Sequence, residues 1–375
     1  MASRQLVTHS PNALKHYRQQ MSLSVDLLAK KTSIKAAKIE DAEANNRVFT
    51  IKQLNKIAEK LLVPVSYLTF DSVIHRDLPE VVDFRNKIEE VSEGDEEQQY
   101  QFNKVVQEAY IDRDNLLGIY ESLNDVPNNF SLELSGCNAK QDANLITEFL
   151  QLKDESLLES NSDYYKSWRT IVEKNDVLVL EKSNPHLSSE GMALYYEKLP
   201  IIVILTTGQP PARRLFTLIH ELVHLGLKQS VLDGSLINSS YDEEIYCNKV
   251  AGYVLVPESV VQKCYSHSAT LTENVLNIRK ITKASRQAVA IQLKQLDLIQ
   301  QNELEDYLNS LRVEISGNFG VKKRYSTYNH FGKVYLQQVF SAIWQEELTI
   351  NTAMDLLRIP NRIEDLKYLE EKAFS

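Results

Sequence analysis

The chain has 375 residues, of which 43% are hydrophobic and 25% are charged, and this ordinary globular composition and length predict two or three domains. The longest apolar runs are too short to span a bilayer, and the N-terminus lacks the apolar core of a signal peptide. The three cysteines have no paired spacing, which suits a reducing compartment. We therefore expect a cytoplasmic protein without a membrane partner. Residues 1–70 hold 11 Lys/Arg and 5 Asp/Glu in a chain of net charge −9, and this asymmetry suggests two units with different partners.

The first seventy residues predict three short helices. One follows an N-cap at Ser24 and runs to about residue 31, a second spans about 35–44, and a third follows Thr50 and ends before Pro64. Two helices joined by a tight turn and braced by a third form a helix-turn-helix arrangement.

This segment resembles the XRE/Cro-type DNA-binding domain over residues 9–70. The resemblance implies a helix-turn-helix fold, a role in transcription regulation, contact with DNA and, commonly, a homodimer. The matching positions hold the helical core and a recurring glutamate: Leu23, Ser24, Leu28, Ala29, Ile34, Ile39, Glu43, Thr50, Leu54, Ile57 and Ala58.

The presumed recognition helix departs from that family in charge. Val25 stands where the family usually has a phosphate-anchoring glutamine, and Glu40, Asp41 and Glu43 oppose the phosphate attraction that dominates DNA affinity. Two interpretations therefore stay open for residues 1–70: sequence-specific DNA binding, or a protein-binding or dimerising helical module.

The middle of the chain predicts one amphipathic helix and a small sheet. Apolar residues recur at mostly helical spacing from residue 99 to 120, after an acidic run. Residues 176–182 and 198–207 predict strands, and a helix is expected to begin at Ala212. This order places the helix directly behind the sheet.

That helix carries His220, Glu221 and His224 within an otherwise apolar stretch, FTLIHELVHLGL. Histidines four residues apart lie on one face of a helix, where both rings can bind one tetrahedral Zn²⁺. In the motif H-E-x-x-H, Glu221 can act as general base on water activated by the metal, without binding the metal itself. The motif predicts a zinc peptidase.

A catalytic zinc site needs a third protein ligand. The next predicted helix, residues 241–257, offers Glu243 and Glu244. Glu244 shares a face with Cys247 and Ala251, but periodicity alone does not choose between the two acids.

The stretches RRLFTLIHELVHLGL and EIYCNKVAGYVLVP resemble the ImmA/IrrE family of metallopeptidases. The second stretch matches the family pattern E-x-x-(A/C)-N-x-x-A, and the resemblance makes Glu244 the third ligand. Residues 81–87 resemble the family's DFR segment, and residues 316–359 resemble the tail of long members. The resemblance implies a zincin-like domain, Zn²⁺ as cofactor, and a narrow protein substrate such as a transcriptional repressor.

Other candidate residues receive structural interpretations. We expect a buried thiol at Cys247 and surface or loop roles for His186, His267 and His330. Tyr246 is one of many tyrosines whose hydroxyl group could stabilise an oxyanion. Residues 258–312 predict helices, and residues 350–369 predict two helices broken at a proline, for packing or partner binding.

The expected fold is α+β and predominantly helical: a helix-turn-helix bundle, then a zincin-like domain with a small sheet. The expected segments are 1–72, a connector at 73–135, the peptidase domain at 136–312 and a helical extension at 313–375. The expected function is zinc-dependent endoproteolysis of a regulatory protein. The alternative is a DNA-binding regulator, or an antitoxin that neutralises a toxin, in which the metal-site fold is kept without proteolysis.

Overall fold

The computed structural model describes residues 5–74, 93–152, 163–187, 190–228, 240–311 and 323–375. The chain divides into two compact units, the first made of residues 1–79, 83–111 and 185–188, and the second of the remainder. The division falls inside α5 (Glu93–Ser122). The finer division into four segments stays a prediction, and the DFR segment at 81–87 lies outside the described residues.

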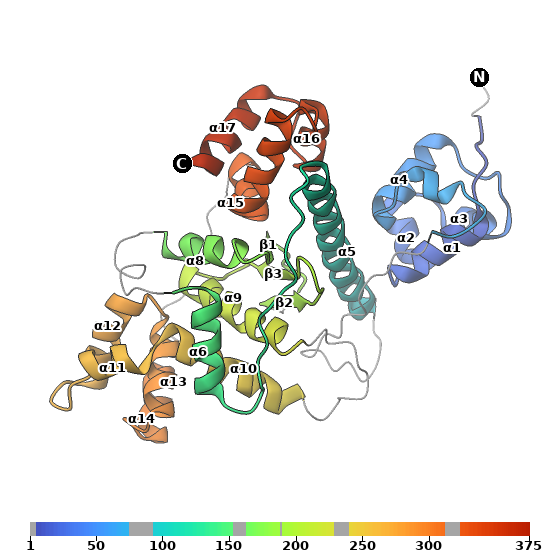
Figure 1. Ribbon diagram of the computed structural model, residues 1–375. Helices are drawn as coiled ribbons and strands as arrows, with labels where there is room; N and C mark the ends of the chain where they lie inside the picture. The colour runs from blue at the N-terminus through green and yellow to red at the C-terminus, as the bar shows by residue number, and fades with distance from the viewer. Residues whose placement is uncertain (1–4, 75–92, 153–162, 188–189, 229–239, 312–322) are drawn as a thin grey trace. The chain divides into compact units, whose positions relative to one another are not determined.

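The first unit is a bundle of short helices with well-formed caps (Figure 1). Ser10 and Ser24 each accept a hydrogen bond from a backbone N–H of the first turn that follows, and Thr50 and Gln53 form a capping box. The three helices predicted from residue 24 onward are present. The elements are α1 (Pro11–Gln20), α2 (Val25–Thr32), α3 (Ala36–Ala44), α4 (Ile51–Leu61) and the 3-10 helix η1 (Val65–Leu68).

One acid of the presumed recognition helix does not face outward. Glu43 pairs with Arg18 in two contacts of 2.5 and 2.9 Å, and both side chains are mostly buried. Counting Glu43 among the groups that oppose phosphate is therefore wrong, because its charge is already neutralised inside the bundle. Glu40 and Asp41 remain exposed.

The second unit is built on a three-stranded mixed sheet. The strands β1 (Leu178–Lys182), β2 (Gly191–Leu194) and β3 (Ile201–Leu205) lie in the order β1-β3-β2. β1 pairs parallel with β3, and β2 pairs antiparallel with it. Every residue of β1 and β3 is buried, as expected for strands covered on both faces. β2 was not predicted from the sequence.

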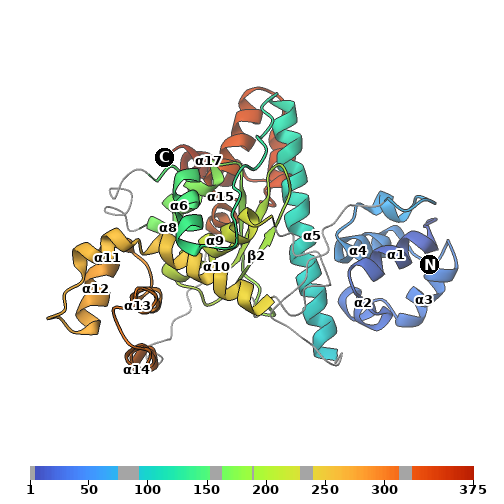
Figure 2. The same ribbon diagram turned by 60° about the horizontal axis from the view of Figure 1, so that its bottom comes forward.

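Helices surround this sheet (Figures 1 and 2). α9 packs on β2 and β3, between α8 and α10, while α15 packs on β1. The helices α11 to α14 pack each against the next, with α13 also against α10, and α16 and α17 pack against α15. Their bounds are α6 (Ala139–Phe149), α8 (Tyr164–Glu173), α9 (Pro211–Gly226), α10 (Ser240–Leu255), α11 (Glu258–Cys264), α12 (Leu271–Thr282), α13 (Arg286–Gln295), α14 (Gln301–Leu311), α15 (Lys323–Trp344), α16 (Ile350–Leu356) and α17 (Ile363–Phe374).

A buried arginine fastens α15 to the sheet. Arg169 contacts Glu173 at 2.7 Å and Glu181 at 3.2 Å, and it donates to the carbonyl of His330 at 3.1 Å. Gly332 interrupts α15 with φ of 78°, and a Cβ atom there would overlap Arg169 and Glu173. The helix α15 therefore packs against the sheet, although it begins more than a hundred residues after the last strand.

The predicted class, α+β and predominantly helical with a small sheet, is confirmed. The predicted pair of helices on either side of Pro360 is also present, as α16 and α17. Within the described ranges, no helix is both long and apolar enough to cross a bilayer.

Candidate metal centre

The histidine pair is buried because the helix that carries it, α9, is apolar on almost every side. Pro211 occupies its first turn, where a missing N–H costs nothing. From residue 217 to 226 every side chain is buried, since α8, α10 and the sheet cover the helix. His220, Glu221 and His224 are only 3%, 4% and 6% exposed. Polar groups buried to this extent need partners.

The two imidazole rings meet a carboxylate from α10. His220 Nε2 lies 3.1 Å from His224 Nε2 and 3.2 Å from Glu244 Oε2, and His224 Nε2 lies 3.4 Å from Glu244 Oε1. Bonds of about 2.0–2.1 Å at tetrahedral angles would separate three zinc ligands by about 3.3–3.4 Å. The three residues therefore fit a single divalent ion, and they are the one such group among the described residues.

The position of Glu243 distinguishes the two candidate acids. Glu243 is not in the group of possible ligands, and its Oε1 is buried without a hydrogen-bond partner in the described part of the chain. Burial raises the pKa of Glu243. The helix phase of α10 thus presents Glu244, and not its neighbour, to the histidines.

The charges of the site are strongly coupled. Burial raises the pKa of Glu244, but hydrogen bonds from His220 and His224 outweigh it and hold that pKa well below its ordinary value. Burial lowers the pKa of His224, but contacts with Cys247 and Glu244 and the charge of Glu221 raise it well above the usual range. The pocket therefore favours positive charge at the point where the three side chains converge. A divalent cation satisfies this requirement as a proton does.

The outer nitrogen atoms of the two rings have different surroundings. Cys247 is fully buried one turn after Glu244, and its Sγ lies 3.7 Å from His224 Nδ1. His220 Nδ1 is buried and has no hydrogen-bond partner in the described residues. The thiol expected to be buried at Cys247 is buried, and it contacts one of the two histidines.

Glu221 lies between α9 and the outer strand β2. A Cβ atom at Gly191 would be 2.7 Å from Glu221 Oε1 and 2.6 Å from Thr217 Cγ2, so only a glycine allows the strand to approach so closely. Sequence reasoning missed Gly191 because β2 has four residues and no alternation of polar and apolar side chains. Gly191 itself, which lies between Glu190 and the apolar residues 192–194, was the available signal.

Three further candidates have clear positions. The hydroxyl of Tyr246 donates to the buried carboxylate of Asp142 at 2.7 Å, so it is already engaged. His186 and His267 are exposed, as expected. The surface role expected for His330 is wrong, because its Nε2 lies 2.9 Å from the fully buried Asp112 and its Nδ1 lies 2.7 Å from the carbonyl of Glu181.

Comparisons with curated proteins and with solved structures find no significant match. A family match covers the sheet and the helices from α9 into α13, and it does not reach the helices α1 to α4, whose helix-turn-helix character stays a prediction. Residues 172–294 match the family model described as IrrE N-terminal-like domain, Peptidase_M78, and this part of the chain is a metallopeptidase-family domain with a candidate metal site at His220, His224 and Glu244.

Proposed function

We propose that the second unit is a zinc-dependent endopeptidase. The observation that carries the proposal is the convergence of three ligand atoms at 3.1–3.4 Å, with Glu221 next to the first ligand on the same helix. His220, His224 and Glu244 would hold the ion. Three protein ligands leave one position of a tetrahedral ion open, as catalytic zinc sites require.

The bound ion would supply Lewis acidity, which lowers the pKa of water to about 7 and polarises a peptide carbonyl. Glu221 would take the proton from the attacking water and return it to the leaving amine. General acid–base catalysis of this kind contributes about 10²–10⁴ to the rate. The buried setting of Glu221 helps, because it keeps bulk water from competing for the carboxylate.

The sheet offers a place for an extended substrate. β2 is an outer strand of the described sheet, and Gly191 brings its backbone against Glu221. An extended peptide can add to the outer edge of a sheet through backbone hydrogen bonds. A substrate bound in this way would pass the candidate base on α9.

The substrate we propose is a regulatory protein, such as a transcriptional repressor. Support comes from the resemblance to the ImmA/IrrE family and from the basic, helical residues 1–70 that precede the domain in the same chain. These residues would deliver the peptidase to its target.

The alternative, a DNA-binding regulator or an antitoxin, draws no support from the described contacts of the first unit. The backbone N–H of Ser24, at the start of α2, donates to the carboxylate of Glu96, and Lys31 of α2 pairs with Glu97 at 2.7 Å. The first helix of a helix-turn-helix crosses the DNA backbone, and its N-terminus is a natural phosphate site. Here carboxylates of α5 already occupy these groups.

The test combines metal analysis with a matched variant. Purified wild-type protein and Glu221→Gln are analysed for zinc by mass spectrometry and then incubated with a proteome-derived peptide library. We expect about one zinc per chain in both proteins and new peptide N-termini with the wild type alone. Equal zinc without any cleavage by the wild type would contradict the enzymatic proposal and leave the metal a structural role.

A further inference from the structure

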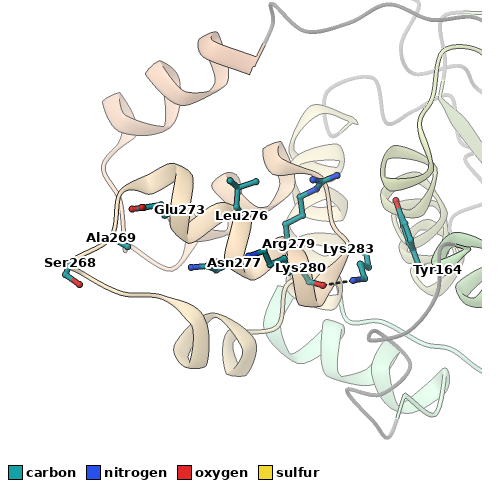
Figure 3. Close-up of a pocket in the computed structure, with 9 residues that line it drawn as sticks. All are labelled: Tyr164, Ser268, Ala269, Glu273, Leu276, Asn277, Arg279, Lys280 and Lys283. Carbon is teal, nitrogen blue, oxygen red and sulfur yellow. Dashed lines mark hydrogen bonds between the residues drawn. The ribbon is translucent and has the colours of Figure 1, made fainter.

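A hollow lies on α12, and none of the residues that line it is a candidate metal ligand. Residues of this helix and of the loop before it form a hollow of about 820 Å³ with Tyr164 of α8 (Figure 3). Figure 3 shows Tyr164 across the hollow from Arg279 and Lys283. The lining contains three cations, Arg279, Lys280 and Lys283, and a single acid, Glu273.

The positive charge of this hollow is not neutralised within the described structure. Glu273 is engaged in the capping box of α12, where its carboxylate accepts hydrogen bonds from Thr270 at 2.8 Å. No carboxylate of the described ranges pairs with the three cations; Lys283 donates instead to a backbone carbonyl, that of Lys280, at 2.6 Å. Residues 274–296 hold five Lys/Arg and no Asp/Glu in a chain of net charge −9. Such a local concentration of positive charge, against the sign of the whole chain, attracts anions.

The lining is not purely ionic, and this bears on the ligand. Leu276 is 37% exposed in the same stripe of α12, one turn before Arg279 and Lys280, and Ala269 also lines the hollow. Asn277 adds an amide that can donate and accept hydrogen bonds. Burial raises the pKa of Tyr164 and the charge of Arg279 opposes this rise, which agrees with a guanidinium facing the phenol. A free inorganic anion would have no use for the apolar part of such a lining.

We propose that this hollow, defined by Tyr164, Leu276, Arg279, Lys280 and Lys283, binds an acidic segment of a partner protein. Carboxylate side chains of the segment pair with the three cations, and an apolar side chain between them packs on Leu276. Arg279 and Lys280 are consecutive residues in the last turn of α12, and Lys283 is its C-cap residue, so the three cations suit several carboxylates of one segment. A DNA duplex is convex and has no apolar group that could reach Leu276 as a protein side chain does. It therefore fits this hollow less well than an acidic protein segment. The site would act whether or not the metal centre cleaves the partner.

Fluorescence polarisation with the full-length protein tests this directly. The probe is a labelled twelve-residue peptide of alternating Glu and Leu, and the reference peptide has Gln in place of Glu. We expect saturable binding of the acidic peptide only, weakened at high salt because exposed ion pairs are screened. Arg279→Ala/Lys280→Ala/Lys283→Ala should weaken binding by about tenfold or more, and Leu276→Ser should weaken it by a smaller factor.

The matched control is Lys174→Ala/Lys198→Ala/Lys249→Ala, which removes three exposed lysines of the same unit outside the hollow. It should bind the acidic peptide as the wild type does, and circular dichroism should show all variants folded. Equal binding of the two peptides, or equal loss in both triple variants, would overturn the proposal. Stronger competition by a duplex DNA of similar length, or complete competition by inorganic phosphate, would also overturn it and assign the hollow to that ligand.

Discussion

Gly191→Ala tests the close approach of β2 to the candidate base. The new methyl group would lie 2.6 Å from Thr217 Cγ2 and 2.7 Å from Glu221 Oε1, whereas non-bonded carbon atoms prefer about 3.5–4.0 Å. Relieving the overlap requires a movement of about 1 Å. Thr217 and Glu221 lie one turn apart on α9 and are both buried, so neither can turn away into solvent.

The cost of this change has two parts. Overpacking a buried site destabilises a protein by about 1–3 kcal/mol. Misplacing a catalytic group by about 1 Å can reduce the rate by about 10²-fold. The heavy atoms nearest to the new methyl group belong to Thr217 and Glu221 and not to the candidate metal ligands, so zinc content should be unchanged. The expected pattern is a folded, zinc-loaded protein with strongly reduced cleavage.

Three measurements on each variant check the pattern: the urea unfolding midpoint, the zinc content and the cleavage rate on a peptide found by library screening. Gly118→Ala is the matched control, since a Cβ atom there meets nothing within 4 Å, and it should be neutral or slightly stabilising. Thr217→Ser added to Gly191→Ala removes one of the two overlaps, so it should recover stability but little activity. A Gly191→Ala protein with unchanged stability and rate would refute the proposed contact.

Three further predictions concern the ligands and the buried charges. Glu244→Gln should reduce zinc content after dialysis while Glu243→Gln retains it, and equal loss in both would reject the assignment of the third ligand. Because the pKa of His224 is raised in the metal-free site, protons compete with the ion, so zinc affinity measured against a fluorescent chelator should fall as the pH falls and recover as it rises. Arg169→Met removes the buried cationic partner of Glu173 and leaves Glu181 with Arg214 alone, so it should lower the free energy of unfolding by about 3–5 kcal/mol. Arg213→Ala, which breaks a partly exposed pair, should lower it by about 1 kcal/mol or less, and similar urea midpoints for these two variants would contradict the argument.

The parts of this structure that follow from local rules were predictable from sequence. A spacing of four residues on a helix fixes the relation of His220 to His224 whatever surrounds them. The caps at Ser24 and Thr50 likewise begin helices through contacts within one turn. Strands with continuous branched apolar residues, such as residues 201–205, are equally local signals.

The parts that were missed depend on packing between distant segments. Periodicity could not choose Glu244 over Glu243, because the rotation of α10 about its axis is set by contacts with α9 and α6. His330 contacts Asp112, which is 218 residues away in the chain, and no local sequence pattern predicts this contact. β2 escaped detection because its placement depends on pairing with β3 rather than on its own residues.

The metal centre needs positive charge whether or not an ion is bound. Glu221 and Glu244 bring two carboxylates to a region where both histidines are almost fully buried. Without an ion, the raised pKa of His224 means that a proton on this ring stabilises the fold at low pH, and that this stabilisation is lost as the pH rises through the raised pKa. An ion at the candidate site would bind better over that same interval, because it would no longer displace the proton. Proton and metal are therefore alternative ways of holding α9 and α10 together at the site, and the stabilisation of the protein by zinc should grow with pH as that of the metal-free protein declines.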